Sequence, residues 1–271
     1  MGRMLRAATA IVAHRGASAR CPENTLAAVQ TAIDLGADAV EVDVRLTADG
    51  APVVLHDASL ARTTDARHRL PGLAPWNVST LTLAQVRSVS AGAWWSAAYE
   101  CEQVPRLAEV LDLLTGTGTG LVLEIKAPQV HRGIERAVAA ELRRAAGFST
   151  TERDGSRLVV QCFDTAGVRR LRTQLPDVTI GLLGHPPISR LAQVAQFADE
   201  VNPPYPTVDA DYVDAVHAVG LTTRVFTVND PDEIRRIAKL GVDAVITDVP
   251  DVAGAVLARR KKSKKAKRVR T

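Results

Sequence analysis

The sequence predicts a closed (β/α)8 barrel, in which helices surround eight parallel strands, with a small insertion after the second barrel strand. Three observations support this fold class. Short β-branched runs alternate with helical patterns along the whole chain, which is typical of a parallel sheet with crossover helices. The strands are almost continuously apolar, as expected when both faces of a strand are buried. The 271 residues of the chain are close to the roughly 250 residues of a single barrel.

Nine segments have the composition of strands. They are residues 10–13, 38–46, 52–55, 121–125, 158–163, 178–183, 200–202, 222–228 and 243–247. Between them lie helices with recognisable ends. Asn24 is predicted to cap a helix that stops at Gly36, and Asp230-Pro231 is predicted to open a helix that stops before Gly241.

The second and third strands cannot both belong to the parallel barrel, because residues 47–51 are too few for a parallel crossover. They are predicted to form a hairpin, which leaves eight parallel strands and one short antiparallel arm. A two-residue type I′ turn at Asp49-Gly50 would place Asp43 directly opposite His56. Asp43 would share its strand face with Glu41, two residues before it.

Residues 57–120 interrupt the alternation of strands and helices. They contain turn signals at Pro71-Gly72 and at 116–120, short helical patterns at 83–89 and 107–114, and all three tryptophans. We interpret this segment as an insertion folded over one end of the barrel.

The basic charge of the chain is concentrated at its C-terminus. The net charge is +4, but residues 259–270 carry nine Lys or Arg and no acid, so the rest of the chain has 25 basic and 30 acidic residues. We therefore assign residues 1–258 to the barrel and 259–271 to a basic tail. The tail is expected to be disordered. The alternative is weak binding of the tail to an anionic membrane surface or to nucleic acid.

The cysteines and the N-terminus indicate a cytoplasmic protein. Cys21, Cys101 and Cys162 have neither a metal-binding nor a redox spacing, and an odd number argues against a disulfide framework. The first 13 residues leave no room for a signal peptide. No apolar run approaches the ~20 residues that a membrane-spanning helix needs.

Polar side chains mark the C-terminal ends of the predicted strands, where barrel enzymes place their active sites. They are His14 and Arg15 after the first strand, Glu41 and Asp43 on the second, His56 after the hairpin arm, and Glu124 and Lys126 at the strand of residues 121–125.

Three of these side chains, Glu41, Asp43 and Glu124, are carboxylates that converge on one mouth of the barrel. At ~4 Å spacing each pair would repel by roughly 4 kcal/mol at an effective dielectric constant of 20, so a cation must lie among them. Oxygen ligands alone favour Mg²⁺ or Ca²⁺ over zinc. The alternative is a buried ion network with the neighbouring basic residues, Arg15, Arg45 and Lys126. The position of each carboxylate at a strand end favours the metal site.

A divalent cation flanked by Arg15 and Lys126, with His14 and His56 within reach, is typical of a phosphate site with acid and base catalysts. A single histidine at a strand end is usually structural. Two histidines beside one carboxylate cluster favour catalysis.

Six motifs together resemble the glycerophosphodiester phosphodiesterases. They follow the order of that family over about residues 11–257. The motifs are His14-Arg15-Gly16, PENT at 22–25, EVD at 41–43 leading to LTADG at 46–50, VVLHD at 53–57 with RTT at 62–64, LEIK at 123–126, and GVDAVITDVP at 241–250.

The resemblance implies a (β/α)8 barrel with a divalent metal that hydrolyses glycerophosphodiesters to sn-glycerol 3-phosphate and an alcohol. Carried over by motif, Glu41, Asp43 and Glu124 resemble the metal ligands. His14 and His56 resemble the general acid and base. The two basic residues that resemble the phosphate-binding groups are Arg15 and Lys126.

The sequence departs from the family pattern at two places. Phe226-Thr227-Val228-Asn229 stands where the family usually has Trp-Thr-Val-Asn. Phe226 preserves an aromatic wall for the substrate pocket but has no indole N–H. Before Phe163, the triplet Val160-Gln161-Cys162 replaces the small serine often found there.

In the implied mechanism, one histidine deprotonates the attacking oxygen and the other protonates the departing alkoxide. The attacking oxygen belongs either to water or to a glycerol hydroxyl of the substrate. Two other functions compete with this one. A lysophospholipase D-type enzyme would act on lysophospholipids. A non-catalytic barrel would serve as a scaffold for the basic tail, although a scaffold has no use for two histidines and three carboxylates.

Four aromatic residues of the insertion allow two interpretations. They would form either its own small core or a hydrophobic lid over an acylated substrate. These residues are Trp76, Trp94, Trp95 and Tyr99.

Overall fold

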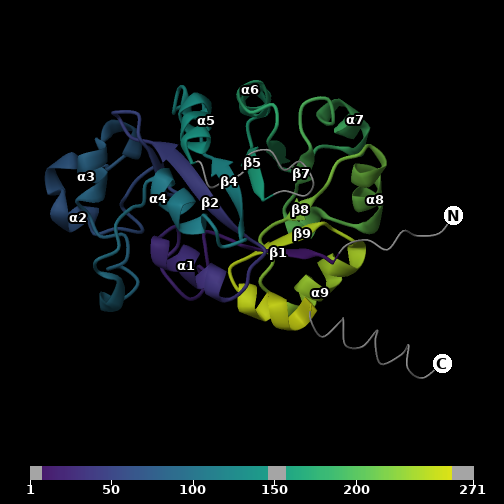
Figure 1. Ribbon diagram of the computed structural model, residues 1–271, viewed down its shortest axis with the longest axis horizontal. Helices are drawn as coiled ribbons and strands as arrows, with labels where there is room; N and C mark the ends of the chain where they lie inside the picture. Colours follow the sequence, from purple (N-terminus) through teal and green to yellow (C-terminus); the bar gives the residue numbers. More distant parts are fainter. Residues whose placement is uncertain (1–7, 146–156, 258–271) are drawn as a thin grey trace.

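Eight parallel strands surround a common axis in the computed structural model, which describes residues 8–145 and 157–257 (Figure 1). The strands are β1 Ala10–Ala13, β2 Ala39–Leu46, β4 Gly120–Ile125, β5 Leu158–Cys162, β6 Thr179–Leu183, β7 Glu200–Asn202, β8 Arg224–Val225 and β9 Ala244–Thr247. Their hydrogen-bonded order is β7-β6-β5-β4-β2-β1-β9-β8. Parallel bridges from Glu200 to Thr222 and from Pro204 to Phe226 join the two ends. The barrel is nearly closed, which confirms the predicted fold class.

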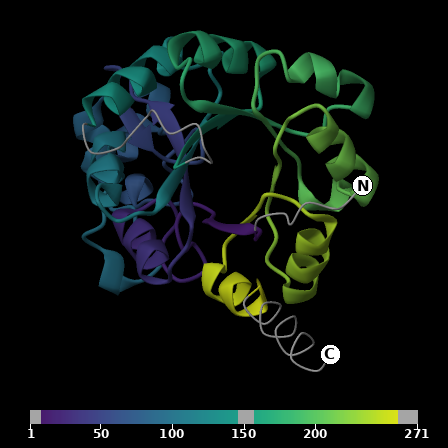
Figure 2. The same ribbon diagram turned by 45° about the vertical axis from the view of Figure 1, so that its right-hand side comes forward.

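Helices form a ring outside the strands (Figure 2). The labelled α-helices are α1 Leu26–Asp34, α2 Ala66–Arg69, α3 Leu83–Arg87, α4 Leu107–Leu114, α5 Ile134–Arg144, α6 Thr165–Gln174, α7 Leu191–Val194, α8 Ala210–Ala218 and α9 Pro231–Leu240. Residues 250–257 are helical as well. None of them, within that part of the chain, has the length and hydropathy needed to span a bilayer. The basic tail predicted at 259–271 lies outside the described residues.

The two helices with predicted ends differ in outcome. Asp230 caps α9 by accepting hydrogen bonds from the backbone N–H groups of Asp232 and Glu233, and Gly241 ends it with φ +92°, as predicted. The predicted cap of α1 was wrong. Thr25, rather than Asn24, accepts the capping bond at α1, because the Asn24 side chain is bound to a carboxylate of β2.

The predicted hairpin is present, but its register was wrong by one residue. The short strand β3 Pro52–Val54 runs antiparallel to β2, and Leu55 rather than His56 lies opposite Asp43, donating its N–H to the Asp43 carbonyl at 2.9 Å. The turn contains three residues, because the Thr47 N–H closes it on the Ala51 carbonyl at 3.1 Å. Gly50 takes the left-handed position with φ +80°, as in three-residue hairpin loops.

The insertion has a hydrophobic core separate from that of the barrel. This core is Val53, Leu55, Leu60, Ala66, Val78, Leu81, Val86, Val89, Ala91 and Val104. Trp76 packs against it and donates its indole N–H to the Leu70 carbonyl at 2.7 Å. Trp94 and Trp95 are each 39% exposed and form an edge-to-face pair. By contrast, helix α4 buries its leucines in the barrel core and contacts α1 and α5, so it belongs to the outer ring.

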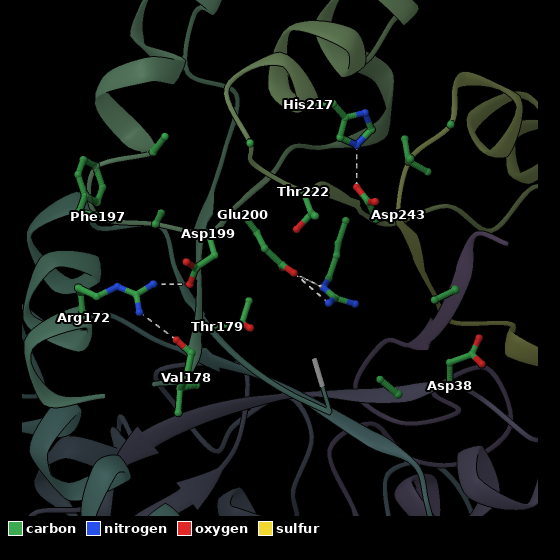
Figure 3. Close-up of a pocket in the computed structure, with 18 of the residues that line it drawn as sticks. Asp38, Arg172, Val178, Thr179, Phe197, Asp199, Glu200, His217, Thr222 and Asp243 are labelled. Carbon is green, nitrogen blue, oxygen red and sulfur yellow. Dashed lines mark hydrogen bonds and ion pairs between the residues drawn. The ribbon is translucent and has the colours of Figure 1, made fainter. Parts of the chain in front are cut away.

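Three aspartates mark the N-terminal end of the barrel. Asp38, Asp199 and Asp243 each stand just before a strand and accept a 2.8 Å hydrogen bond from a backbone N–H of the neighbouring strand segment. The donors are Ile11, Ile180 and Thr223. These strand-start aspartates line a cavity of about 710 Å³, shown in Figure 3. Inside it, Arg224 donates to Glu200 at 2.8 Å as a buried ion pair.

Gly16, directly after the first strand, allows the chain to pass close to α1. Its φ is +78°, and a Cβ atom there would lie 2.5 Å from the Ala28 carbonyl carbon. Gly50 has φ +80° but no atom within 4 Å of its Cβ position.

Gly50→Ala should therefore cost about 1–2 kcal/mol of unfolding free energy for the left-handed backbone alone. Gly16→Ala should cost a further 1–3 kcal/mol for overpacking, measured by urea unfolding. Equal losses in the two variants would contradict the close approach.

Candidate active site

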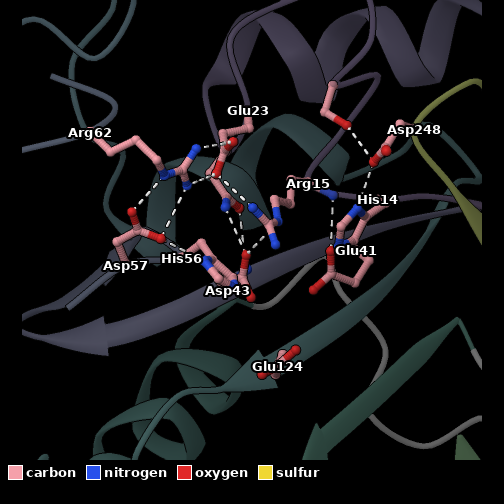
Figure 4. Close-up of polar contacts among 12 residues, drawn as sticks. His14, Arg15, Glu23, Glu41, Asp43, His56, Asp57, Arg62, Glu124 and Asp248 are labelled. Atoms are coloured by element: carbon pink, nitrogen blue, oxygen red, sulfur yellow. Dashed lines mark hydrogen bonds and ion pairs between the residues drawn. The ribbon is translucent and has the colours of Figure 1, made fainter. Parts of the chain in front are cut away.

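The structure brings the three predicted carboxylates together at the C-terminal end of the barrel. Glu41 and Asp43 lie on β2, and Asp43 is paired in register with Glu124 on β4. One oxygen from each residue lies within 4.8 Å of the others. The three residues are only 1%, 1% and 8% exposed. Figure 4 shows them between the loops that carry His14 and His56.

Burial and mutual repulsion disturb the titration of this cluster. Burial and the nearby charge of Asp43 raise the pKa of Glu41 to about 8. The same two causes raise the pKa of Glu124. Burial alone would also raise the pKa of Asp43, but the charges of Lys126 and Arg15 lower it below its usual value. The cluster therefore holds more negative charge than its basic neighbours stabilise.

Glu41 keeps one oxygen unpaired inside the cluster. Its Oε2 accepts a 2.9 Å hydrogen bond from the Arg15 backbone N–H, which the positive φ of Arg15, 55°, turns toward it. Its Oε1 is buried and has no hydrogen-bond partner within the described residues. A buried carboxylate oxygen without a partner is costly. Together with the all-oxygen donor set, it fits a hard divalent cation.

The basic residues pair only in part with this cluster. Lys126 Nζ lies 2.6 Å from Glu124 Oε1 and 3.3 Å from Asp43 Oδ1, and Arg15 Nε lies 3.4 Å from Asp43 Oδ2. Arg45, the third basic residue of the alternative ion network, instead donates two hydrogen bonds to the His56 carbonyl, at 2.9 and 2.6 Å. Since these contacts leave Glu41 Oε1 unpaired, the ion network does not account for the whole cluster.

Both predicted histidines are held by a neighbouring aspartate. His14 Nδ1 lies 2.6 Å from Asp248 Oδ1, and His56 Nδ1 lies 2.7 Å from Asp57 Oδ1. An aspartate on Nδ1 fixes the orientation of the ring and leaves Nε2 to exchange protons with a substrate. Each histidine can therefore carry a proton at a defined atom.

The two histidines differ in their pKa shifts. Burial alone would lower the pKa of His14, but the bond to Asp248 and the charge of Glu41 raise it above its usual value. Burial, together with the charges of Lys126 and Arg15, lowers the pKa of His56 below its usual value, although Asp43 and Asp57 act in the opposite direction.

His56 reaches the site by a different route from the one that the sequence predicted. Strand β3 ends at Val54, so no strand pairing positions His56. The two hydrogen bonds from the Arg45 guanidinium hold the His56 carbonyl instead. The side chain therefore lies beside Asp43 although Leu55 occupies the predicted position opposite it.

Several residues of the site were missed as site residues in the sequence. Arg15 Nη1 and Arg62 Nη2 both donate to Glu23 Oε1, at 2.8 and 2.7 Å. Arg62 also pairs with Asp57, and this bond lowers the pKa of Asp57. Asn24 donates to Asp43 Oδ2 at 2.8 Å. The sequence did contain a signal for them, because Glu23 and Asn24 lie in the PENT motif, Asp57 in VVLHD and Arg62 in RTT.

Phe226, the residue expected to form a wall of the substrate pocket, follows β8 at the same end of the barrel. Its ring centroid is 6.1 Å from that of Phe163, with the two rings nearly perpendicular. Phe163 follows β5 and is 55% exposed, whereas Phe226 follows β8 and is half-buried. The two rings form an apolar edge next to the charged cluster.

Asp248→Asn should uncouple His14 from its carboxylate. We expect the pKa of His14 to fall, because burial remains while the charge is removed. A raised histidine pKa stabilises the fold below about pH 6.5 and loses that effect as the pH rises through the folded-state value. The loss of stability should therefore be about 1–3 kcal/mol at pH 5 and smaller at pH 9, measured by NMR titration and thermal unfolding. Asp251→Asn, which weakens an ion pair with the 55% exposed Arg20 and involves no histidine, is the control. A pH-independent loss would contradict the coupling.

Comparison with known proteins agrees with this arrangement. Residues 14–252 match the Glycerophosphoryl diester phosphodiesterase family. The chain is 31% identical to the glycerophosphodiester phosphodiesterase of Caldanaerobacter subterraneus subsp. tengcongensis, over 90% of this chain and 95% of that protein. It is 30% identical to the enzyme of that name from Bacillus subtilis, over 89% and 84%.

A solved structure extends this comparison. The chain is similar to an Oleispira antarctica phosphodiesterase, solved in complex with the product sn-glycerol-3-phosphate. The TM-score is 0.82 at 26% identity, and the match covers 93% of this chain and 97% of the other.

Proposed function

Because the chain belongs to the glycerophosphoryl diester phosphodiesterase family, we propose that it hydrolyses glycerophosphodiesters to sn-glycerol 3-phosphate and an alcohol. One observation carries this proposal. Two histidine–aspartate pairs, His14–Asp248 and His56–Asp57, are held beside one buried cluster of three carboxylates. A diester hydrolase needs both a proton acceptor and a proton donor at a site that tolerates a phosphate.

We assign the divalent cation to Glu41, Asp43 and Glu124. The unpaired Glu41 oxygen and the all-oxygen donor set support this assignment, and such ligands suit Mg²⁺ or Ca²⁺. When bound, the cation would stabilise negative charge on the phosphoryl oxygens.

Arg15 and Lys126 would bind the phosphate. Each is a half-buried cation beside the carboxylate cluster, with a side chain 18% and 14% exposed, respectively. A guanidinium offers a planar fork of donors to phosphate oxygens, and an ammonium offers a compact charge. The bond to Glu23 fixes the direction of the Arg15 guanidinium.

The two histidines would transfer the protons. One Nε2 removes a proton from the attacking oxygen while the other donates a proton to the departing alkoxide. Asp248 and Asp57 hold the opposite ring nitrogens, so that each Nε2 stays directed at the reacting groups. A non-catalytic scaffold would not need either pair.

We propose a cytoplasmic location for the enzyme. All three cysteines, of which Cys101 is exposed, are free thiols. Free thiols are typical of proteins in a reducing compartment.

Removal of the basic tail should separate turnover from surface binding. Truncation after Ala258 removes the nine Lys and Arg of the C-terminus. We expect turnover of a soluble diester to be unchanged, while salt-sensitive binding to anionic vesicles is lost. Vesicle sedimentation at low and high salt, with DNA as a second ligand, measures this. A severalfold loss of turnover on the soluble diester would show that the tail acts at the site.

The proposed function is tested by measuring sn-glycerol 3-phosphate released from glycerophosphocholine, glycerophosphoethanolamine and glycerophosphoglycerol. Activity should disappear with EDTA and return with Mg²⁺ or Ca²⁺. The matched control is the His14→Ala/His56→Ala double variant, purified in parallel. Hydrolysis of lysophospholipid only, with release of lysophosphatidic acid, or no release of sn-glycerol 3-phosphate from any diester in any metal, would overturn the proposal.

A further inference from the structure

Gln161 lies beside the carboxylate cluster but has no role in the proposed mechanism. It stands on β5, directly paired in register with Glu124 on β4. Residues paired across parallel strands point to the same side of the sheet, so Gln161 points into the barrel with Glu124. It is 2% exposed. A neutral amide therefore borders the carboxylate cluster on the β5 side.

A hydrogen bond from Asn202 fixes the orientation of the Gln161 amide. Asn202 Nδ2 donates to Gln161 Oε1 at 2.9 Å, and the Arg224 backbone N–H donates to Asn202 Oδ1 at 2.8 Å. Asn202 is completely buried. Gly181 makes the space for this pair, because a Cβ there would lie 2.9 Å from Asn202 Nδ2 and 3.2 Å from the Gln161 Cβ. The oxygen of Gln161 is therefore engaged, and its nitrogen is the free end.

Gln161 Nε2 has two N–H donors and no hydrogen-bond partner within residues 8–145 and 157–257. Gln161 does not line the cavity at the N-terminal end of the barrel. Its register partner Glu124 belongs to the carboxylate cluster at the other end, so the amide borders that end of the barrel. Gln161 Nε2 is not among the fully buried polar atoms without a partner, so this unbonded donor keeps some accessible surface, and a substrate oxygen can supply its acceptor.

The surroundings indicate which part of the substrate this is. Phe163 follows Gln161 by two residues, and its ring packs against Phe226. A neutral donor next to an aromatic edge suits a small polyol, whose carbons contact the rings and whose hydroxyl oxygen accepts the hydrogen bond. We propose that Gln161 Nε2 donates to a hydroxyl oxygen of the glycerol moiety and thereby selects glycerol. This inference rests on the proposed function.

Product analogues test the inference without depending on turnover of the analogue. sn-Glycerol 3-phosphate carries the hydroxyls, and ethyl phosphate lacks them. Both are measured as competitive inhibitors and by calorimetric titration. In Gln161→Met, which keeps the length of the side chain but loses the donors, the inhibition constant of sn-glycerol 3-phosphate should rise about tenfold. That of ethyl phosphate should change less than twofold. Gln193→Met, on the exposed face of α7, is the matched control.

The outcomes separate this inference from the proposed function. Equal weakening of both ligands would assign Gln161 to the phosphate or the carboxylates, and no weakening would remove it from the site. Either result would overturn the inference while the wild-type enzyme still released sn-glycerol 3-phosphate. A wild-type enzyme that released none would overturn the proposed function instead. If Gln161→Met fails to fold by thermal unfolding, Gln161→Asn must show the same selective loss, since its shorter amide cannot reach the hydroxyl.

Discussion

Replacing His14 or His56 with alanine should lower kcat by at least about 100-fold, and up to about 10,000-fold, because general acid and base groups each contribute that much. The fold should persist in both variants. The loop of His56 is held through its backbone carbonyl by Arg45, and this contact does not need the imidazole. Steady-state kinetics with a glycerophosphodiester, together with circular dichroism, measures the two effects.

The leaving group should distinguish the two histidines. A nitrophenolate departs without a proton, so the histidine that protonates the leaving group should matter little for a 4-nitrophenyl diester. The histidine that deprotonates the attacking oxygen should matter for both substrates. Near-normal turnover of the alkyl diester in either alanine variant would assign that histidine a structural role.

Glu41→Gln and Glu124→Gln should lower the affinity for a divalent cation by at least about 10-fold, since removing a direct ligand should cost no less than removing its outer-shell partner. Added Mg²⁺ or Ca²⁺ should partly restore turnover in these two variants. It should not restore turnover in His14→Ala, which serves as the control. Calorimetric titration of the metal into EDTA-treated protein provides a readout that is independent of turnover. Unchanged cation affinity in both variants would contradict the proposed ligand set and favour a network of ion pairs.

The parts of the structure that were predicted correctly depend on short-range patterns. The strand of Glu41 and Asp43 alternates apolar residues with charged ones, so its side-chain period of two residues places both carboxylates on one face. The alternation of strands and helices places Glu124 on the next barrel strand. For this reason, the carboxylate cluster and the barrel could be predicted from local periodicity together with one topological rule.

The parts that could not be predicted depend on contacts between distant residues. Asp248 holds His14 across 234 positions of sequence, and no periodicity connects the two. The hairpin register differs from the predicted one by one residue, because the turn has three residues rather than two. The hydrogen bond from the Thr47 N–H to the Ala51 carbonyl sets this turn length. Asn24 was predicted as a helix cap because asparagine is a favoured capping residue. In the structure its side chain binds the Asp43 carboxylate instead. The local preference of asparagine for a helix cap was overridden here because the buried Asp43 carboxylate needs hydrogen-bond partners.

Because of the strand-start aspartates, the two ends of the barrel should differ in how well they tolerate sequence changes. Asp38, Asp199 and Asp243 fix the axial offset between strands through backbone hydrogen bonds at the end away from the histidines. Loops at the opposite end take no part in these bonds. New loops can therefore be grafted at the catalytic mouth while the stagger of the barrel is kept. Substitutions in the loops at the catalytic end can therefore change substrate preference in evolution without disturbing the contacts that set the strand offset.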